Sequence, residues 1–185
     1  MDLYQETIHN WNLLAEAYEQ RFMDLAIYNE TYEEFCKDLP SEHPHVFETG
    51  SGPGNICAYL LKRCPQLQWY GTDAAPDMVQ RARQNNPTAR FDVMDIREIS
   101  RVQERFDGIV SGFVIPYIKE DDCKRFIRDC YTLLHPNGLL YLSYVEGQVS
   151  QSGYQTGSTG LKMYFHYYPA GFLTTCLKEA GFGSI

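Results

Sequence analysis

The sequence has no long hydrophobic run. Nowhere do about eighteen apolar residues stand together, the length that a helix needs to cross a bilayer, so a membrane-spanning protein is not expected. The first residues, MDLYQETIHNW, are acidic and polar where a secretory signal needs a basic segment followed by an apolar one. We therefore expect a cytoplasmic protein.

Cysteine pairs of the Cys-x-x-Cys type are also missing. The six cysteines are scattered over segments with helical patterns, and cysteines in a reducing compartment are commonly buried and unpaired. We therefore expect neither a disulfide nor zinc. His43 and His45 resemble a ligand pair, but they lie at the start of the first expected strand, at the end opposite the crevice, so we interpret them as loop residues and predict no metal site.

Positive charge is scarce. The chain has 16 Lys and Arg residues against 24 Asp and Glu, a formal net charge of −8, and no basic cluster dense enough to follow a phosphate backbone. Nucleic acid is therefore not an expected partner. Internal repeats, low-complexity tracts and linkers are missing too, so residues 1–185 are expected to form a single domain, as a monomer or a homodimer.

The helical and strand patterns that are present divide the chain at about residue 40. Residues 3–22 carry an aromatic stripe at helical spacing, and a second helix is expected at 28–39, before Pro40. Beyond them, strands are expected at 45–49, 67–72, 89–93, 107–113 and 138–145, and helices at 54–63, 76–85, 119–134 and 169–180. This alternation predicts an α/β fold, a Rossmann-like, doubly wound and mainly parallel sheet.

A glycine-rich turn, GSGPG at residues 50–54, follows the first expected strand. In such a sheet the ligand crevice lies at the carboxyl ends of the strands, and glycines let a ligand approach the backbone at the start of the next helix. Dinucleotides and S-adenosylmethionine both fit this geometry. A dinucleotide turn follows the pattern GxGxxG, whereas the sixth position here is Asn55.

Three acidic residues end the first three strands and favour S-adenosylmethionine. Glu48 is placed to meet the ammonium group of an amino-acid ligand, and Asp73 to accept hydrogen bonds from both ribose hydroxyls. Asp95 is placed to accept a hydrogen bond from an adenine amino group, beside Met94 and Ile96. No partner for a pyrophosphate accompanies them.

The sequence resembles the class I S-adenosylmethionine-dependent methyltransferases, in particular the small stand-alone ones. The resemblance runs from residue 45 onward through FETGSGPGN, YGTDAAPDMVQRAR, FDVMDIREI and FDGIVSGFVIPYI, followed by LLHPNGLLYLSY and LKEAGF. It implies a core at 45–185 and a helical lid at 1–40 that lies over the cofactor. The cofactor-binding residues that it implies, together with those argued above, are Tyr18, Glu48, Gly50, Ser51, Gly52, Gly54, Asp73, Ala74, Met78, Asp95, Ile96, Gly112 and Phe113.

The expected chemistry is methyl transfer to a small-molecule acceptor. The cofactor already activates the methyl group, so the protein mainly has to orient and enclose the reactants. If the acceptor must lose a proton, the candidate bases are Tyr117, Tyr164 and His166. The fourth strand ends GFVIPYI and lacks the Asn-Pro-Pro-Tyr signature of DNA and glutamine N-methyltransferases, which together with the acidic charge favours a small acceptor.

Residues 146–168 are too long for an ordinary connection and are expected to form an extended loop or hairpin. Acceptor choice is expected to come from this segment and from the helix at 3–22, which together would cover the crevice; ordinary packing of their tyrosines is the alternative. Class I sheets normally close with an antiparallel strand pair, so the resemblance implies that this pair is truncated after FGSI; a genuinely shorter sheet is the alternative. Two rival functions stay open: an NAD(P)-dependent oxidoreductase and a non-catalytic cofactor-binding module.

Overall fold

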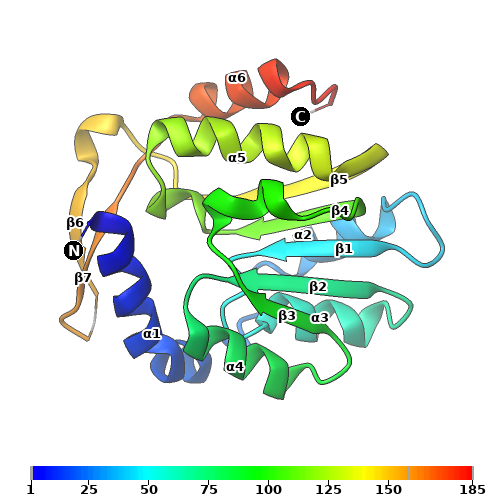
Figure 1. Cartoon of the computed structure of the whole chain (residues 1–185), viewed down its shortest axis with the longest axis horizontal. Coiled ribbons are helices and arrows are strands. Elements are labelled where there is room, and N and C mark those ends of the chain that lie inside the picture. Colours follow the sequence, from blue (N-terminus) through cyan, green and yellow to red (C-terminus); the bar gives the residue numbers. More distant parts are fainter. Residues whose placement is uncertain (1, 158, 185) are drawn as a thin grey trace.

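The computed structural model describes residues 2–157 and 159–184; Met1, Ser158 and Ile185 lie outside this description. Its centre is a sheet of five parallel strands in the order β3-β2-β1-β4-β5 (Figure 1). The strands are β1 (His45–Thr49), β2 (Gln68–Asp73), β3 (Arg90–Val93), β4 (Phe106–Gly112) and β5 (Leu134–Ser143). Because β2 and β3 lie on one side of β1 and β4 and β5 on the other, the strand order reverses between β1 and β4, where open α/β sheets bind their ligands.

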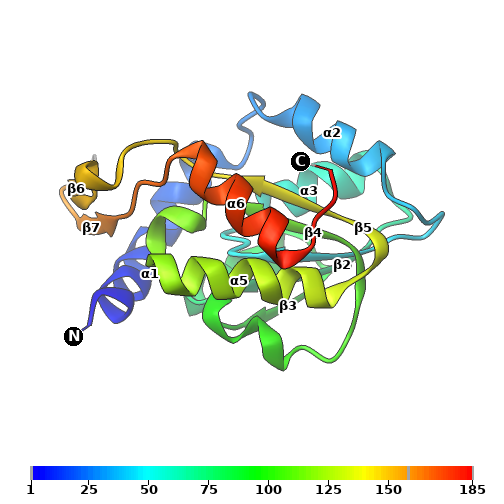
Figure 2. The ribbon, with the colours of Figure 1, turned by 90° about the horizontal axis from the view of Figure 1, so that it is seen from above.

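Helices cover both faces of the sheet, as Figure 2 shows. One face packs against α2 (Asn29–Lys37), α3 (Asn55–Arg63) and α4 (Pro76–Asn85), and the other against η1 (Ile96–Arg101), α5 (Glu120–Leu133) and α6 (Ala170–Ala180). Neighbouring residues of β1 therefore enter different cores: Val46 packs among the residues of α2 and α3, and Phe47 among those of α5. This two-sided burial explains why the strands are apolar without alternation.

The predicted α/β class and parallel sheet are confirmed, and the element bounds shift by a few residues. The largest shift is at β5, which begins at Leu134 and not at residue 138. The strand is irregular there, because its pairing with β4 slips between Phe106 and Gly108, and Asn137 adopts a positive φ of 66°. On its outer side β5 has no strand partner among residues 2–157 and 159–184.

The segment 146–168 forms the expected hairpin, with η3 (Val149–Gln151), β6 (Gly153–Thr156) and β7 (Lys162–Phe165). It does not join the main sheet. In Figures 1 and 2 the hairpin lies beside α1 (Leu3–Phe22), at the end toward which the carboxyl ends of the strands point. Asn10 Nδ2 donates a hydrogen bond to the carbonyl of Lys162 (2.8 Å), and the hydroxyl of Tyr154 donates to Glu6 (2.8 Å), so the helix and the hairpin are joined directly.

The cysteine expectation is wrong for one pair. Cys36 near the end of α2 and Cys64 just after α3 form a disulfide with Cα atoms 7.5 Å apart, wider than the usual range of about 4.4–6.8 Å. Packing of two helices on the same face brings them together, which no sequence spacing indicates. The remaining cysteines are free and buried, as expected: Cys57, Cys123, Cys130 and Cys176.

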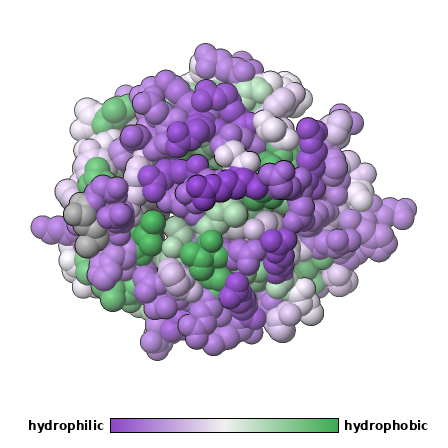
Figure 3. All heavy atoms as spheres, in the orientation of Figure 1, coloured by the Kyte–Doolittle hydropathy of each residue, from purple (hydrophilic) through white to green (hydrophobic). Residues whose placement is uncertain are grey.

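The surface in Figure 3 is largely hydrophilic, and hydrophobic residues reach it in small patches. Within the described part of the chain, no helix combines the length and the apolar character that a membrane crossing requires.

Candidate functional site

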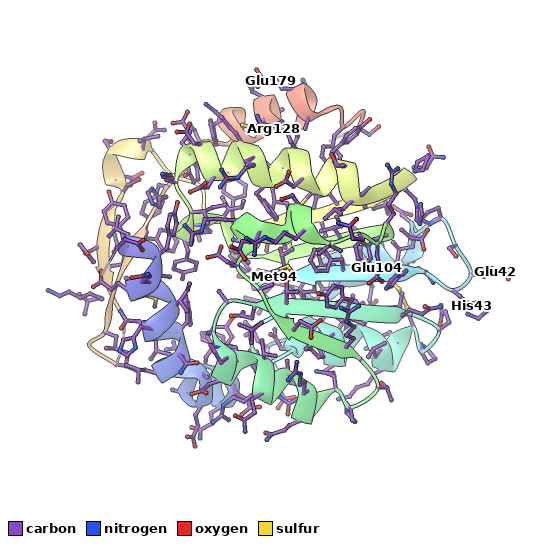
Figure 4. The ribbon with its side chains drawn as sticks, in the orientation of Figure 1. Glu42, His43, Met94, Glu104, Arg128 and Glu179 are labelled. Carbon is purple, nitrogen blue, oxygen red and sulfur yellow. A yellow bond between two sulfur atoms is a disulfide. The ribbon has the colours of Figure 1, made fainter. Side chains whose placement is uncertain are left out.

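A cavity of about 420 Å³ opens at the carboxyl ends of the strands, below α1. We call it the main cavity. Its size lies within the usual range of ligand pockets, roughly 300–1,000 Å³. Most of the predicted cofactor residues line it: Tyr18, Gly50, Gly52, Asp73, Ala74, Met78, Asp95, Ile96, Gly112 and Phe113. Met94 also lines it and lies at the end of the strands nearest α1 in Figure 4, whereas His43 lies at the opposite end of the molecule.

The glycine turn requires glycine because its backbone is left-handed and because neighbouring side chains leave no space for a Cβ atom at Gly50 and Gly54. Gly50, Gly52 and Gly54 all have positive φ angles, of 63°, 52° and 80°. A Cβ atom on Gly50 would lie 2.3 Å from Val114 Cγ2, so the turn touches the loop after β4 directly. Gly54 packs against α4 and is outside the wall of the cavity; a Cβ there would lie 2.4 Å from Asn86 Nδ2.

Asp73 both faces the main cavity and holds the glycine turn in place. Its two carboxylate oxygens accept hydrogen bonds from the backbone N–H of Gly52 (2.9 Å) and of Ala75 (2.8 Å). Burial raises the pKa of Asp73, and these backbone hydrogen bonds act in the opposite direction. Since each oxygen can accept more than one hydrogen bond, Asp73 can still accept from a diol in the cavity.

Asp95 is held by a residue that the sequence interpretation missed. Arg97 donates to both carboxylate oxygens of Asp95, through Nε (2.9 Å) and a terminal nitrogen (2.6 Å), and its backbone N–H donates as well (2.9 Å). Burial alone would raise the pKa of Asp95, but the hydrogen bonds and charge of Arg97 lower it below its usual value. The signal was present in MDIREI, where an arginine stands two residues after the acid.

Glu48 lies beside the main cavity in a smaller hollow of about 50 Å³, which we call the side hollow. The residue is only 1% exposed, and its Oε2 accepts a hydrogen bond from Trp69 Nε1 (3.1 Å). Burial raises the pKa of Glu48 to about 8, the hydrogen bond from Trp69 lowers it, and the charge of Asp73 raises it further. Ser51 also borders the side hollow, and its hydroxyl has no hydrogen-bond partner among the described residues.

Aromatic side chains form the wall of the main cavity opposite the strand ends. Trp11 on α1 makes edge contacts with Tyr18 (5.3 Å between ring centroids) and with Tyr117 of η2 (Ile115–Tyr117; 5.5 Å). Tyr117 in turn contacts Phe165 of β7 (5.6 Å). Aromatic contacts thus run from α1 through η2 to β7, but no described residue of the hairpin lines the main cavity or the side hollow, so a direct role of the hairpin in the crevice stays a prediction.

Tyr164 and His166 lie outside the walls of the two cavities, whereas the third catalytic candidate, Tyr117, lines the main cavity. Side chains alternate between the two faces of a strand, so Phe165 and its two neighbours in the chain point in opposite directions. Phe165 faces Tyr117, whereas Tyr164 and His166 contact each other on the other face, with their rings tilted by 54° and the ring centroids 4.8 Å apart. The period of two along KMYFHYY separates Phe165 from Tyr164 and His166, but it does not indicate which of the two faces turns toward Tyr117.

The groups around the two cavities fit S-adenosylmethionine. Asp73 offers a carboxylate for ribose hydroxyls, and Met78, Met94 and Ile96 offer apolar surface for adenine. The side hollow adds the carboxyl of Glu48 and the unpartnered hydroxyl of Ser51, which suit the amino-acid end. Gly54 caps α3 without a side-chain hydrogen bond, so backbone N–H groups at the start of that helix stay available.

Comparison with known proteins agrees with this assignment. The family model of a methyltransferase domain matches residues 46–138, about half of the chain. Trans-aconitate 2-methyltransferase of Variovorax paradoxus (strain S110) is 30% identical over 99 residues, 54% of this chain and 38% of that protein. Release factor glutamine methyltransferase of Agrobacterium fabrum is 34% identical over 80 residues, 41% of this chain and 27% of that protein. The chain thus matches well under half the length of these two relatives.

A solved structure shares the whole fold. The complex of DhpI with SAH superposes with a TM-score of 0.76 at 15% identity, covering 97% of this chain and 87% of that one. At 15% identity this similarity is evidence for the fold alone. The matching domain, the strand order and the fit of the cavity lead to one conclusion: the chain belongs to the class I S-adenosylmethionine-dependent methyltransferases, and S-adenosylmethionine is its cofactor.

Proposed function

We propose that this methyltransferase acts on a small molecule. The observation that carries the proposal is that the site is covered: residues of α1 form one wall of the main cavity. The hairpin is joined to α1 by the hydrogen bond from Asn10 to Lys162. It is joined to the segment that contains η2 by the hydrogen bond from His166 N to the carbonyl of Pro116 (2.7 Å). A volume of about 420 Å³ has to hold both cofactor and acceptor. That space suits a compact acceptor, and the acidic sequence has no dense cluster of Lys and Arg that would favour a nucleic acid.

When bound, the cofactor supplies a methyl group on a positively charged sulfur, which needs no further activation. The protein's residues bind and orient. Asp73 and Asp95 hold the nucleoside part, Glu48 and the glycine turn meet the amino-acid part, and the aromatic wall excludes water from the space beside the sulfur.

Tyr117 orients the acceptor in this proposal and does not serve as a base. Burial raises the pKa of Tyr117, so its hydroxyl keeps its proton over the physiological range and can donate a hydrogen bond. A role of Tyr164 in acceptor binding stays a prediction, and it would require the hairpin to move because Tyr164 lies outside both cavities. The same holds for His166, whose pKa is lowered by burial, which favours its neutral form.

The test of the proposal combines binding with labelled transfer. Calorimetry is expected to show binding of S-adenosylmethionine and of its demethylated product in the micromolar range, with no measurable binding of NAD. Incubation with methyl-labelled cofactor and a pool of small metabolites is expected to give a labelled product. Binding without any labelled product would favour the non-catalytic module, and transfer only to protein or nucleic acid added in parallel would contradict a small acceptor.

Glu48 is expected to make both stability and cofactor affinity depend on pH. Because its pKa is about 8 in the folded protein against an ordinary 4.5, the native state holds a proton that the unfolded state releases between these values. The free energy of unfolding should therefore fall as the pH rises through this window. The ammonium group of the cofactor favours the ionised form, so binding at neutral pH should expel the proton, and affinity should rise toward pH 8.

The Glu48→Gln variant keeps an acceptor for Trp69 but cannot ionise. We expect it to be more stable than the wild type at the upper end of the window, by on the order of 2 kcal/mol, and to bind the cofactor about tenfold more weakly. Denaturant titrations and calorimetry at several pH values measure both effects. Glu42→Gln, on an exposed loop far from the cavities (Figure 4), is the matched control. A wild type whose stability does not change across the window would contradict this assignment.

A further inference from the structure

We propose that the methyl acceptor is an uncharged, planar molecule whose nucleophile is a heteroaromatic ring nitrogen. The inference rests on the proposed function and narrows its substrate class. It follows from three properties of the main cavity: its charges, its aromatic wall and the proton acceptors that it lacks.

The charges around the main cavity disfavour an anionic acceptor. No Lys, Arg or His lines it among the described residues, and its charged side chains are Asp73 and Asp95. Arg97 lies next to Asp95, but its guanidinium is engaged by both oxygens of that carboxylate and stacks on the ring of Tyr4 (3.8 Å). A carboxylate or phosphate acceptor would lose its hydration without gaining a positively charged partner from the protein.

The aromatic wall favours a flat acceptor and a growing positive charge. Trp11 and Tyr117 contact each other edge to face, and both line the main cavity together with Tyr4, Tyr18 and Phe113. Aromatic faces bind planar apolar rings, and they also attract cations. A nitrogen that becomes positive during the reaction is therefore stabilised by the same side chains that bind its ring.

Among the described residues, the wall that α1 and η2 form around the main cavity has no side chain that could take a proton from a hydroxyl. The polar groups there are hydroxyls and an indole: Thr7 already donates to the carbonyl of Leu3 (2.9 Å), Tyr4 donates to Asp122, and buried Tyr117 keeps its proton. Asp73 and Asp95 accept hydrogen bonds from backbone N–H groups and from Arg97, and in the proposed function they also hold the nucleoside of the cofactor. The acceptor atom must then carry its lone pair without losing a proton first, as a pyridine-type nitrogen does.

The transfer balances without a base. The lone pair of the ring nitrogen forms the new N–CH₃ bond while the carbon–sulfur bond breaks and leaves its electron pair on sulfur. The positive charge passes from sulfur to nitrogen, and no proton is released.

Three probes of similar shape test the inference: quinoline, a quinoline carboxylate and naphthol. Binding to the protein–SAH complex is measured by quenching of Trp11 fluorescence, with Trp11→Phe giving the background of buried Trp69. We expect quinoline to bind and to accept labelled methyl. The carboxylate should bind at least about tenfold more weakly because its charge finds no partner. Naphthol should bind but not be methylated, because nothing takes its proton.

The outcomes separate the inference from the proposed function. Three results would contradict the inference while leaving the proposed function intact, provided that SAH binds: quinoline neither quenches Trp11 fluorescence nor accepts methyl, the quinoline carboxylate binds as tightly as quinoline, or naphthol is methylated as fast as quinoline. Failure of SAH itself to bind would instead reject the proposed function. In Trp11→Leu the methylation of quinoline should fall at least about tenfold, as expected for a lost aromatic face; Leu13→Ala, at a residue of the same helix that is 60% exposed, should leave it unchanged.

Discussion

The Asp73→Ala variant is expected to lose about two orders of magnitude of affinity for S-adenosylmethionine. Two charge-assisted hydrogen bonds to ribose, each contributing roughly 1.5–3 kcal/mol, disappear with the carboxylate. The backbone N–H groups of Gly52 and Ala75 also lose their acceptor, so the glycine turn is no longer held in its binding shape. Isothermal calorimetry with the cofactor measures the loss, and circular dichroism checks that the variant folds.

Two further variants make the Asp73 result specific. Asp73→Asn offers one carbonyl oxygen to two backbone donors, so it should recover only part of the affinity. Asp92→Ala removes a half-buried acid of the neighbouring strand β3. Its ion pairs with Arg83 and Arg90 lie at the surface, and such pairs contribute little, at most about 1 kcal/mol. Unchanged affinity in a folded Asp73→Ala protein would reject the role of Asp73.

Gly50→Ala is expected to remove cofactor binding and to lower the melting temperature. The added Cβ would lie 2.3 Å from Val114 Cγ2, and the φ angle of 63° is unfavourable for alanine. The left-handed backbone costs about 1–2 kcal/mol and the overlap about 1–3 kcal/mol. For a chain of this length, that sum corresponds to a fall of roughly 4–20 °C. Relief of the overlap would shift Val114 and the adjacent Phe113, which line the main cavity, so binding is lost as well.

Scanning calorimetry and cofactor titration are the measurements for Gly50→Ala. Gly153→Ala is the control, because a Cβ there meets nothing within 4 Å and the φ angle is not positive. Adding Val114→Ala to Gly50→Ala removes the overlap but not the backbone strain, so stability should return in part. If the Gly50→Ala protein binds the cofactor with the affinity of the wild type, the glycine turn can accommodate a Cβ atom beside Val114, and this prediction is wrong.

The sequence by itself determined the fold class, the glycine turn and the acids at the strand ends. These features are local: a strand is a short apolar run, a turn is a few consecutive glycines, and in a parallel sheet the residues after successive strands reach the same edge. Glu48, Gly50, Asp73 and Asp95 could therefore be located before any contact was known, and the structure brings all four to the two adjoining cavities.

Only the tertiary structure decided which partners these residues have. The side hollow around Glu48 needs β1, β2 and the two N-terminal helices to be packed together, and the raised pKa of Glu48 follows from that burial. The choice of Phe165 over Tyr164 and His166 depended on which face of β7 turns toward η2. Segments far apart in the chain likewise bring Cys36 to Cys64, and they leave Tyr117 without a base beside it among the residues that the structure describes. Contacts of this kind depend on the packing of whole elements, which a local residue pattern does not contain.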